Sequence, residues 1–265
     1  MKKRILPLLI LTALSLLMAA CKPDLAATQP TAIPTLTTST EAAESAAEES
    51  PEYASLGWWN EAVFYEIFVR SFKDSDGNGI GDLRGIIEML DYLNDGDPNT
   101  TSDLGITGIW LMPIFPSPSY HGYDVTDYKA VNPDYGTLQD FQDLLEACHE
   151  RGIRVIIDFV INHTSSEHPW FVSSKNEASE YRSWYVWSDT KLTQTGPWGQ
   201  NAWYESGGSF YYAPFWSGMP DLNYKEPKVT EAMYDATKFW LDMGVDGFRV
   251  DAARYLVEEG ATLQD

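Results

Sequence analysis

Two charged residues stand close together at the end of an apolar run, 245–250. Side chains alternate between the two faces of a strand, so Arg249 and Asp251 are expected to emerge on the same face. An adjacent guanidinium favours the ionised form of a carboxylate, which would keep Asp251 charged at neutral pH. Such a pair fits either a reactive carboxylate or a structural ion pair that ends the strand.

A second polar group ends the apolar run 153–160 and consists of Asp158, Asn162 and His163. The neutral imidazole of His163 can hydrogen-bond a hydroxyl group of a ligand, although a structural histidine fits the same pattern. Asp158 and Asn162 are expected to hold loops or a metal rather than to react. Both polar groups therefore follow runs that read as buried strands.

A candidate cation-binding loop precedes these runs and alternates oxygen-bearing side chains with small residues. Compared with the calcium loop of an EF-hand, it supplies positions 1, 3 and 5, the glycine at 6, a backbone carbonyl at 7 and a carboxylate at 9. Position 12 of that template is Gly85 instead of glutamate, so the loop is not an EF-hand. We expect Ca²⁺ to bind here, and the alternative is a solvated turn rich in Asp and Gly. The predicted ligands are Asp74, Asp76, Asn78, the carbonyl of Ile80, and Asp82.

Strand and helix patterns alternate along most of the chain, which predicts βαβ units and a parallel sheet. Both polar groups then lie at the carboxyl ends of strands, where a parallel α/β barrel carries its chemistry. About sixty residues after His163 lack this pattern and are rich in Trp and Tyr, which predicts an inserted subdomain over 164–223. The expected strands cover 63–69, 105–112, 153–160 and 245–250, and the expected helices cover 82–93, 138–150 and 227–243.

The start of the chain has the composition of an export signal, with basic residues before an apolar run that is too short for a membrane span. Small residues directly before Cys21 resemble a bacterial lipoprotein processing site. We therefore expect a signal peptide at 1–20 and a lipid on Cys21, and an ordinary signal peptide is the alternative. Residues 21–56 are rich in Thr, Pro, Ala, Ser and Glu, which predicts a disordered linker after the lipidated cysteine.

The composition indicates a globular domain with a strongly acidic surface. The 265 residues are 44% hydrophobic and 14% aromatic, which is enough apolar material for a sizeable core. The formal net charge of −21 disfavours nucleic acid and anionic lipid headgroups as partners, so membrane contact is expected only through the lipid on Cys21. With Cys21 modified, Cys148 has no partner for a disulfide, and a buried structural thiol is expected.

Three motifs in this order resemble those of the α-amylase superfamily of glycoside hydrolases. Gly-Phe-Arg-Val-Asp at 247–251 resembles the motif of the fourth barrel strand, and Asp-Phe-Val-Ile-Asn-His at 158–163 resembles that of the third strand. Met-Pro-Asp-Leu-Asn at 219–223 is similar to a short signature of a group intermediate between oligo-1,6-glucosidases and neopullulanases. The resemblance extends from about residue 58 to the end of the chain.

The resemblance implies a (β/α)8 TIM barrel of which this chain holds the first four βα units, with a subdomain inserted after the third strand. Residues 57–163 would form strands 1–3 of that barrel. Residues 224–265 would contain helix 3, strand 4 and the start of helix 4.

The resemblance also implies roles for single residues. Asp251 would be the nucleophile, Arg249 would maintain its charge, and His163 would contact the sugar at the cleavage point. The loop 121–128 resembles the family's loop at that point, with Tyr123 as a stacking platform and Asp124 supporting it. A tyrosine offers a flat apolar face with a polar edge, which suits a sugar ring.

The implied function is that of a retaining glycosidase that cleaves α-1,4-glucosidic bonds in starch and maltooligosaccharides, at the outer face of a membrane to which Cys21 anchors it. The family's proton donor is a glutamate at the end of the fifth strand, so this chain alone is expected to be inactive. The alternatives are an α-glucosidase or transglycosylase of the same superfamily, and a catalytically silent surface protein that binds glycans.

Overall fold

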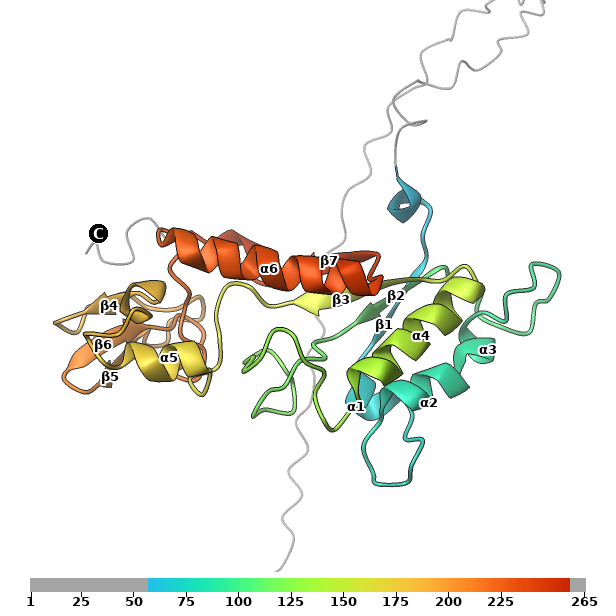
Figure 1. Ribbon diagram of the computed structural model, residues 1–265, viewed down its shortest axis with the longest axis horizontal. Helices are drawn as coiled ribbons and strands as arrows, with labels where there is room; N and C mark the ends of the chain where they lie inside the picture. Colours follow the sequence, from blue (N-terminus) through green and yellow to red (C-terminus); the bar gives the residue numbers. More distant parts are fainter. Residues whose placement is uncertain (1–56, 258–265) are drawn as a thin grey trace, which may run out of the picture. The chain divides into compact units, whose positions relative to one another are not determined.

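The computed structural model describes residues 57–257 (Figure 1). All of them belong to one compact unit. The predicted signal peptide, Cys21 and the predicted linker lie outside the described residues, as do residues 258–265. Within 57–257, no helix is long and apolar enough to cross a membrane.

The main sheet has four parallel strands whose order in space follows their order in the chain. The prediction of a parallel α/β sheet is therefore confirmed. Closure into an eight-stranded barrel stays a prediction, because residues 57–257 contribute four strands to this sheet. The strands are β1 (Phe64–Ile67), β2 (Gly108–Leu111), β3 (Arg154–Phe159) and β7 (Gly247–Val250).

Two long helices form where they were expected, α4 (Leu138–Glu150) and α6 (Pro227–Met243). The side chain of Thr137 caps the first turn of α4 and accepts a hydrogen bond from the backbone N–H of Asp140, whose own carboxylate bonds back to Thr137. Helix α6 starts with its proline in the first turn and ends at Gly244, whose left-handed φ of 110° favours glycine.

The helix expected over 82–93 is instead two short helices, α2 (Leu83–Glu88) and α3 (Leu90–Leu93). The backbone of Met89 leaves the helical range with φ −101° and ψ 2°. Its N–H donates to the carbonyl of Ile86, three residues back, so the α-helical hydrogen-bond register stops there. Another short helix, α1 (Val69–Phe72), directly follows β1 and was not expected from the sequence.

Aromatic rings connect the helices to one another and to the loop that follows β2. The buried ring of Trp240 on α6 packs edge-on against Phe141 of α4, with ring centroids 5.2 Å apart. It also lies 5.5 Å from Phe115, and its indole N–H donates to the carbonyl of Tyr128 at 2.7 Å. Helix α2 packs beside α4 (Figure 1). Cys148 lies buried within α4 as a free thiol, and burial raises its pKa to about 12.

A small antiparallel sheet lies within the segment predicted as an insertion, and its strand order is β4-β6-β5. Many of the aromatic rings of this segment pack against one another. For example, Phe171 stacks on Trp187 with ring centroids 5.7 Å apart. The boundaries of an inserted subdomain stay a prediction. The elements are α5 (Pro169–Ser174), η3 (Arg182–Trp184), β4 (Trp187–Ser188), β5 (Trp203–Ser206) and β6 (Ser209–Tyr212).

Candidate active site

Arg249 lies between two carboxylates at the carboxyl end of the main sheet. One of its terminal nitrogens, Nη1, donates to Asp251 Oδ1 at 2.6 Å and to the two oxygens of Asp158 at 3.0 and 3.2 Å. The strand register makes this possible, because Asp158 of β3 pairs with Arg249 of β7. The expected meeting of Arg249 with Asp251 is thus observed, and Asp158 joins it.

Asp251 follows β7 and continues its pairing, since its N–H donates to the carbonyl of Phe159 at 3.1 Å. The chain then turns sharply at Ala252, whose φ of 49° is in the left-handed region. A residue with a side chain costs roughly 1–2 kcal/mol in that region. The strained turn leads the backbone away from the sheet directly after the candidate nucleophile, a position where strain is often functional.

Asp158 is fully buried, and its carboxylate accepts hydrogen bonds from Tyr123 as well as from Arg249. The hydroxyl of Tyr123 donates to Oδ2 at 3.0 Å. Burial raises the pKa of the Asp158 carboxyl to about 6, although Arg249 and Tyr123 act in the opposite direction. The sequence assigned this residue to loops or a metal, and the structure instead places it on the arginine beside Asp251.

The buried side chain of Asp124 stabilises the loop that carries Tyr123. Asp124 accepts hydrogen bonds from the hydroxyls of Ser117, at 2.6 Å, and Ser119. The N–H of Tyr123 donates to Nδ1 of His121 at 3.1 Å. These contacts orient the Tyr123 ring, and they agree with a supporting role for Asp124 rather than one in contact with a ligand.

His163 is buried and hydrogen-bonds the same loop, because its Nε2 lies 3.1 Å from the carbonyl of Tyr123. A carbonyl only accepts, so Nε2 carries the proton in this contact. Burial lowers the pKa of the His163 imidazole to about 4, which keeps the ring neutral near pH 7.

A cavity of about 400 Å³ opens over Asp251. Its volume is in the range of small-molecule sites, and its wall is largely aromatic. It brings together the predicted site residues Asp251, Tyr123 and His163 from three different segments, while their roles stay predictions. Asp251 is the one acidic residue among its lining residues within 57–257, which are His121, Tyr123, His163, Trp198, Phe215, Trp216, Met219, Asp251, Ala252 and Tyr255.

The inserted segment contributes part of this wall. The ring of Trp198 is 76% exposed and lies 5.9 Å from that of Phe215, which in turn lies 5.3 Å from the His163 ring. The Trp- and Tyr-rich composition of 164–223 predicts a subdomain, but it does not single out the wall residues Phe215 and Tyr255. Periodicity could not have found them, because Phe215 lies in a loop and Tyr255 belongs to a 3-10 helix of three residues, η4 (Ala253–Tyr255).

The motif at 219–223 lies directly beside the end of β3. Asp221 forms a β-bridge with His163, and its carboxylate accepts a hydrogen bond from the side-chain amide of Asn162 at 2.9 Å. The N–H of Leu222 donates to the carbonyl of Asn162 at 2.9 Å. Two of the three sequence motifs are therefore joined to each other, and Asn162 serves as a connection between loops.

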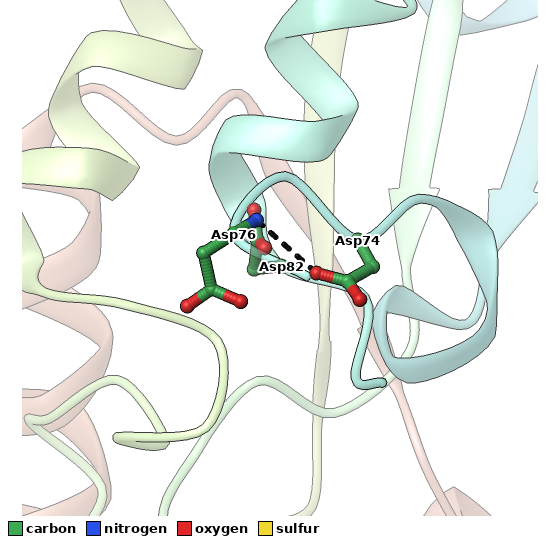
Figure 2. Close-up of side chains that lie close together, drawn as sticks. All are labelled: Asp74, Asp76 and Asp82. Atoms are coloured by element: carbon green, nitrogen blue, oxygen red, sulfur yellow. Dashed lines mark hydrogen bonds between the residues drawn. The ribbon is translucent and has the colours of Figure 1, made fainter. Parts of the chain in front are cut away.

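The three aspartates of the candidate cation loop gather before α2 (Figure 2), with one carboxylate oxygen from each lying within 4.8 Å of the others. Asp74 also accepts backbone N–H groups, from Gly77 at 2.7 Å and from Gly79 at 2.8 Å. The Gly79 contact is the largest of the effects that lower the pKa of Asp74, which keeps the carboxylate charged. Each carboxylate oxygen has two lone pairs, so these bonds leave sites for a hard cation. The loop can therefore hold a metal ion, while Ca²⁺ itself and the predicted ligands Asn78 and Ile80 stay predictions.

Most of this chain is similar in sequence to known proteins. Residues 66–263 match the family model described as alpha amylase, catalytic domain. Alpha-amylase 3 of Dictyoglomus thermophilum is 52% identical over 203 residues, which cover 76% of this chain and 38% of that protein. Trehalose synthase of a Pimelobacter species is 45% identical over 227 residues, covering 81% of this chain and 37% of that protein.

A solved structure is similar over the same part of the chain. The crystal structure of the alpha-amylase from H. orenii has a TM-score of 0.71 and 60% sequence identity, and the match covers 76% of this chain and 42% of that one. The chain thus spans about two fifths of the length of the proteins it matches.

Proposed function

Because the chain belongs to the α-amylase family of glycoside hydrolases, we propose that the full-length protein cleaves α-1,4-glucosidic bonds in starch and maltooligosaccharides with retention of configuration. The observation that carries this proposal is the position of Asp251, which lies against Arg249 and lines a cavity with aromatic walls. A charged carboxylate in such a cavity can attack the anomeric carbon of a bound sugar.

The proposed reaction needs a second carboxyl group. A retaining glycosidase holds its two carboxyl groups about 5–5.5 Å apart, one as nucleophile and one as acid and base. Asp251 would form the covalent glycosyl intermediate while the second group protonates the departing oxygen. No other carboxylate from residues 57–257 lines the cavity, so the acid and base is proposed to come from another part of the full-length protein.

The surrounding residues would position the sugar. Tyr123 presents its ring to the cavity while Asp158 holds its hydroxyl, so the ring can serve as a stacking platform. His163 is neutral and lines the same cavity, where its ring would form part of the surface that contacts the sugar. The negative charge on Asp251 would stabilise the oxocarbenium character of the transition state.

A second candidate function is that of an α-glucosidase or a transglycosylase. The similarity to a trehalose synthase supports it, because hydrolysis and transfer can share one covalent intermediate and differ in the acceptor. The aromatic wall of Trp198 and Phe215 would then bind an acceptor sugar. A glycan-binding protein without activity is disfavoured, because Asp251 and Arg249 are both present and in contact.

The substitution Asp251→Asn in the full-length protein tests the proposal. The variant keeps the shape of the side chain but loses the nucleophile, so we expect starch hydrolysis to fall by at least 10³-fold. The wild-type protein should release α-anomeric sugar first, which polarimetry or NMR detects. Asp242→Asn, which removes an exposed ion pair on α6, is the control and should retain activity. Undiminished hydrolysis by Asp251→Asn would refute the assignment, and products built by sugar transfer would favour the second candidate.

We also propose two features outside the catalytic cavity. One is a Ca²⁺ ion at the loop of Asp74, Asp76 and Asp82, supported by the grouping of the three carboxylates. The other is a lipid on Cys21 that anchors an exported protein to a membrane, supported by the residues that precede this cysteine.

A further inference from the structure

Asp158 and Asp251 share a single nitrogen of Arg249. Nη1 of Arg249 carries two protons, yet it lies within 3.2 Å of three carboxylate oxygens. The contact to Asp251 is the shortest, at 2.6 Å. The two carboxylates therefore compete for the same positive charge, and a change in the charge of one alters the pairing of the other.

We propose that Asp158 is a positioning residue that sets how strongly Arg249 neutralises Asp251, and thereby sets the acid side of the enzyme's pH range. This inference rests on the proposed function, since it concerns the proposed nucleophile. It adds a role for a buried aspartate that does not line the cavity.

The surroundings of Asp158 allow this role. Among residues 57–257, the titratable groups that act on it are Arg249 and Asp251 from the β7 side and Tyr123 from the loop after β2. The other face of the Arg249 guanidinium lies over the ring of Trp110 on β2, 5.1 Å from its centroid. The guanidinium is thus confined between a ring and two carboxylates. Within residues 57–257, Arg249 is the only cation that forms a salt bridge with Asp158 or Asp251.

The protonation state of Asp158 would act through Arg249. Ionised Asp158 draws part of the hydrogen bonding of Nη1, which leaves the Asp251 carboxylate less neutralised and more nucleophilic. When Asp158 takes up a proton, Arg249 pairs with Asp251 alone and stabilises its negative charge more strongly. Burial raises the pKa of Asp158 to about 6, so this change falls in the range where such enzymes can operate.

Asp158→Asn in the full-length enzyme tests the proposal by kinetics. The acid limb of kcat/KM on a chromogenic maltooligosaccharide should move to lower pH by on the order of one unit, because Asp251 then has Arg249 to itself and no charged neighbour. The plateau should fall because the carboxylate is a weaker nucleophile. Asp246→Asn is the matched control, since Asp246 also pairs with a strand arginine, Arg154, but at the opposite end of the sheet. It should leave the acid limb in place.

Tyr123→Phe covers the case in which Asp158→Asn fails to fold. It keeps the ring and removes the hydroxyl that stabilises ionised Asp158, so Asp158 takes up its proton at higher pH. The acid limb should then move in the same direction as in Asp158→Asn, by a smaller amount. Acid limbs at the wild-type pH in both variants, with activity merely reduced, would show a structural role and overturn the proposal.

A second measurement does not depend on activity, because coupling between two sites is reciprocal. Carbon-13 NMR of labelled aspartate carboxyls can follow the titration of Asp158, which Asp158→Asn identifies by the loss of its signal. In Asp251→Asn, the pKa of Asp158 should fall by roughly one unit, because a like charge is removed and Arg249 is less shared. An unchanged titration would overturn the inference. A wild-type enzyme inactive on every glucan would instead refute the proposed function, and the NMR result would still decide the inference.

Discussion

The three charged side chains Asp158, Arg249 and Asp251 carry one net negative charge when both carboxyls are ionised. They are held by hydrogen bonds through one guanidinium nitrogen, and the hydroxyl of Tyr123 completes the group. Placing a buried carboxylate here costs solvation, as the raised pKa of Asp158 shows. Such a cost is tolerated where the charge serves a site, and the adjacent cavity indicates that it does.

Two buried histidines should make the free energy of unfolding depend on pH. Burial lowers the pKa of both His163 and His168 to about 4, so the unfolded chain binds these protons first. Their contribution is complete above pH about 6.5 and is lost as the pH falls through about 4, on the order of 3 kcal/mol for each ring. Asp158, with its raised pKa, acts in the opposite direction over about pH 6 to 4.

Since two groups oppose one, we expect the free energy of unfolding to fall by a few kcal/mol between pH 6.5 and 4. Urea unfolding of the full-length protein at a series of pH values measures this change. His168→Gln should flatten the dependence, because one of the two imidazoles is removed. A stability that is constant or rises on acidification would contradict the prediction.

At the scale of elements, short loops position most of the chemistry while strands and helices hold those loops. The turn that presents Trp198 is closed by a backbone hydrogen bond from the N–H of Gly196 to the carbonyl of Gln200, and the Gln200 side chain donates to the carbonyls of Pro214 and Phe215. The tip of one loop is thus tied to the next. An exposed indole at such a tip forms a defined part of the cavity wall.

Trp198→Ala tests whether this wall binds sugar. Loss of a stacking surface should raise KM for maltooligosaccharides about tenfold in the full-length enzyme, with a smaller effect on an aryl α-glucoside that reaches fewer sugar positions. Tyr234→Ala is the matched control, because Tyr234 is 71% exposed on α6 and does not line the cavity. Equal kinetics of Trp198→Ala and wild type on both substrates would show that the indole does not contact the glucan.

The loop before α2 carries the proposed Ca²⁺ site, and metal removal tests it. Binding to the native state alone would stabilise by about 2.7 kcal/mol at a hundredfold excess over Kd, so chelation should lower the Tm of the full-length protein. Asp74→Asn should abolish this response. Asp97→Asn, in another loop rich in aspartate, should retain it. A Tm that is indifferent to chelator, together with no bound metal by elemental analysis, would contradict the proposal.

At the scale of the whole molecule, the main sheet has two edges among residues 57–257. β1 and β7 each pair with one strand, and Val63 beside β1 and Val250 on β7 are 58% and 39% exposed. Exposed apolar edges of a parallel sheet are normally covered. The chain spans about two fifths of the length of its relatives, so we expect further strands of the full-length protein to pair with these edges.

The proposed anchor concerns the whole molecule and is tested by Cys21→Ser. Expressed in a bacterium, the protein should partition into the detergent phase with the membrane fraction, because an acyl chain contributes about 0.8 kcal/mol per buried CH₂. The variant should move to the aqueous phase. Cys148→Ser changes a buried thiol within α4 and should not alter partitioning. Unchanged partitioning of Cys21→Ser would refute the anchor.

Most of the fold could be predicted because local patterns and local stop signals agree. Helix α4 begins after Thr137, and α6 begins at Pro227 and ends at Gly244; each of these residues acts within one turn of the chain. The break at Met89 could not be predicted, because the apolar spacing of 82–93 continues across it. The local sequence predicts the presence of a helix through its apolar periodicity, whereas a break within the helix depends on what packs against it.

The candidate site also has one part that the sequence could predict and another that it could not. Alternation along one strand was sufficient to place Arg249 beside Asp251, since two residues on one strand face need no knowledge of the neighbouring strand. The sharing of Arg249 with Asp158 depended on the register between β3 and β7, which no local pattern contains. The aromatic wall of Trp198 and Phe215 likewise depended on how the segment 164–223 folds back toward the residues that follow β7. Residues far apart in sequence meet only through tertiary packing, and so the sequence determined the candidate reacting groups while the tertiary structure decided their partners.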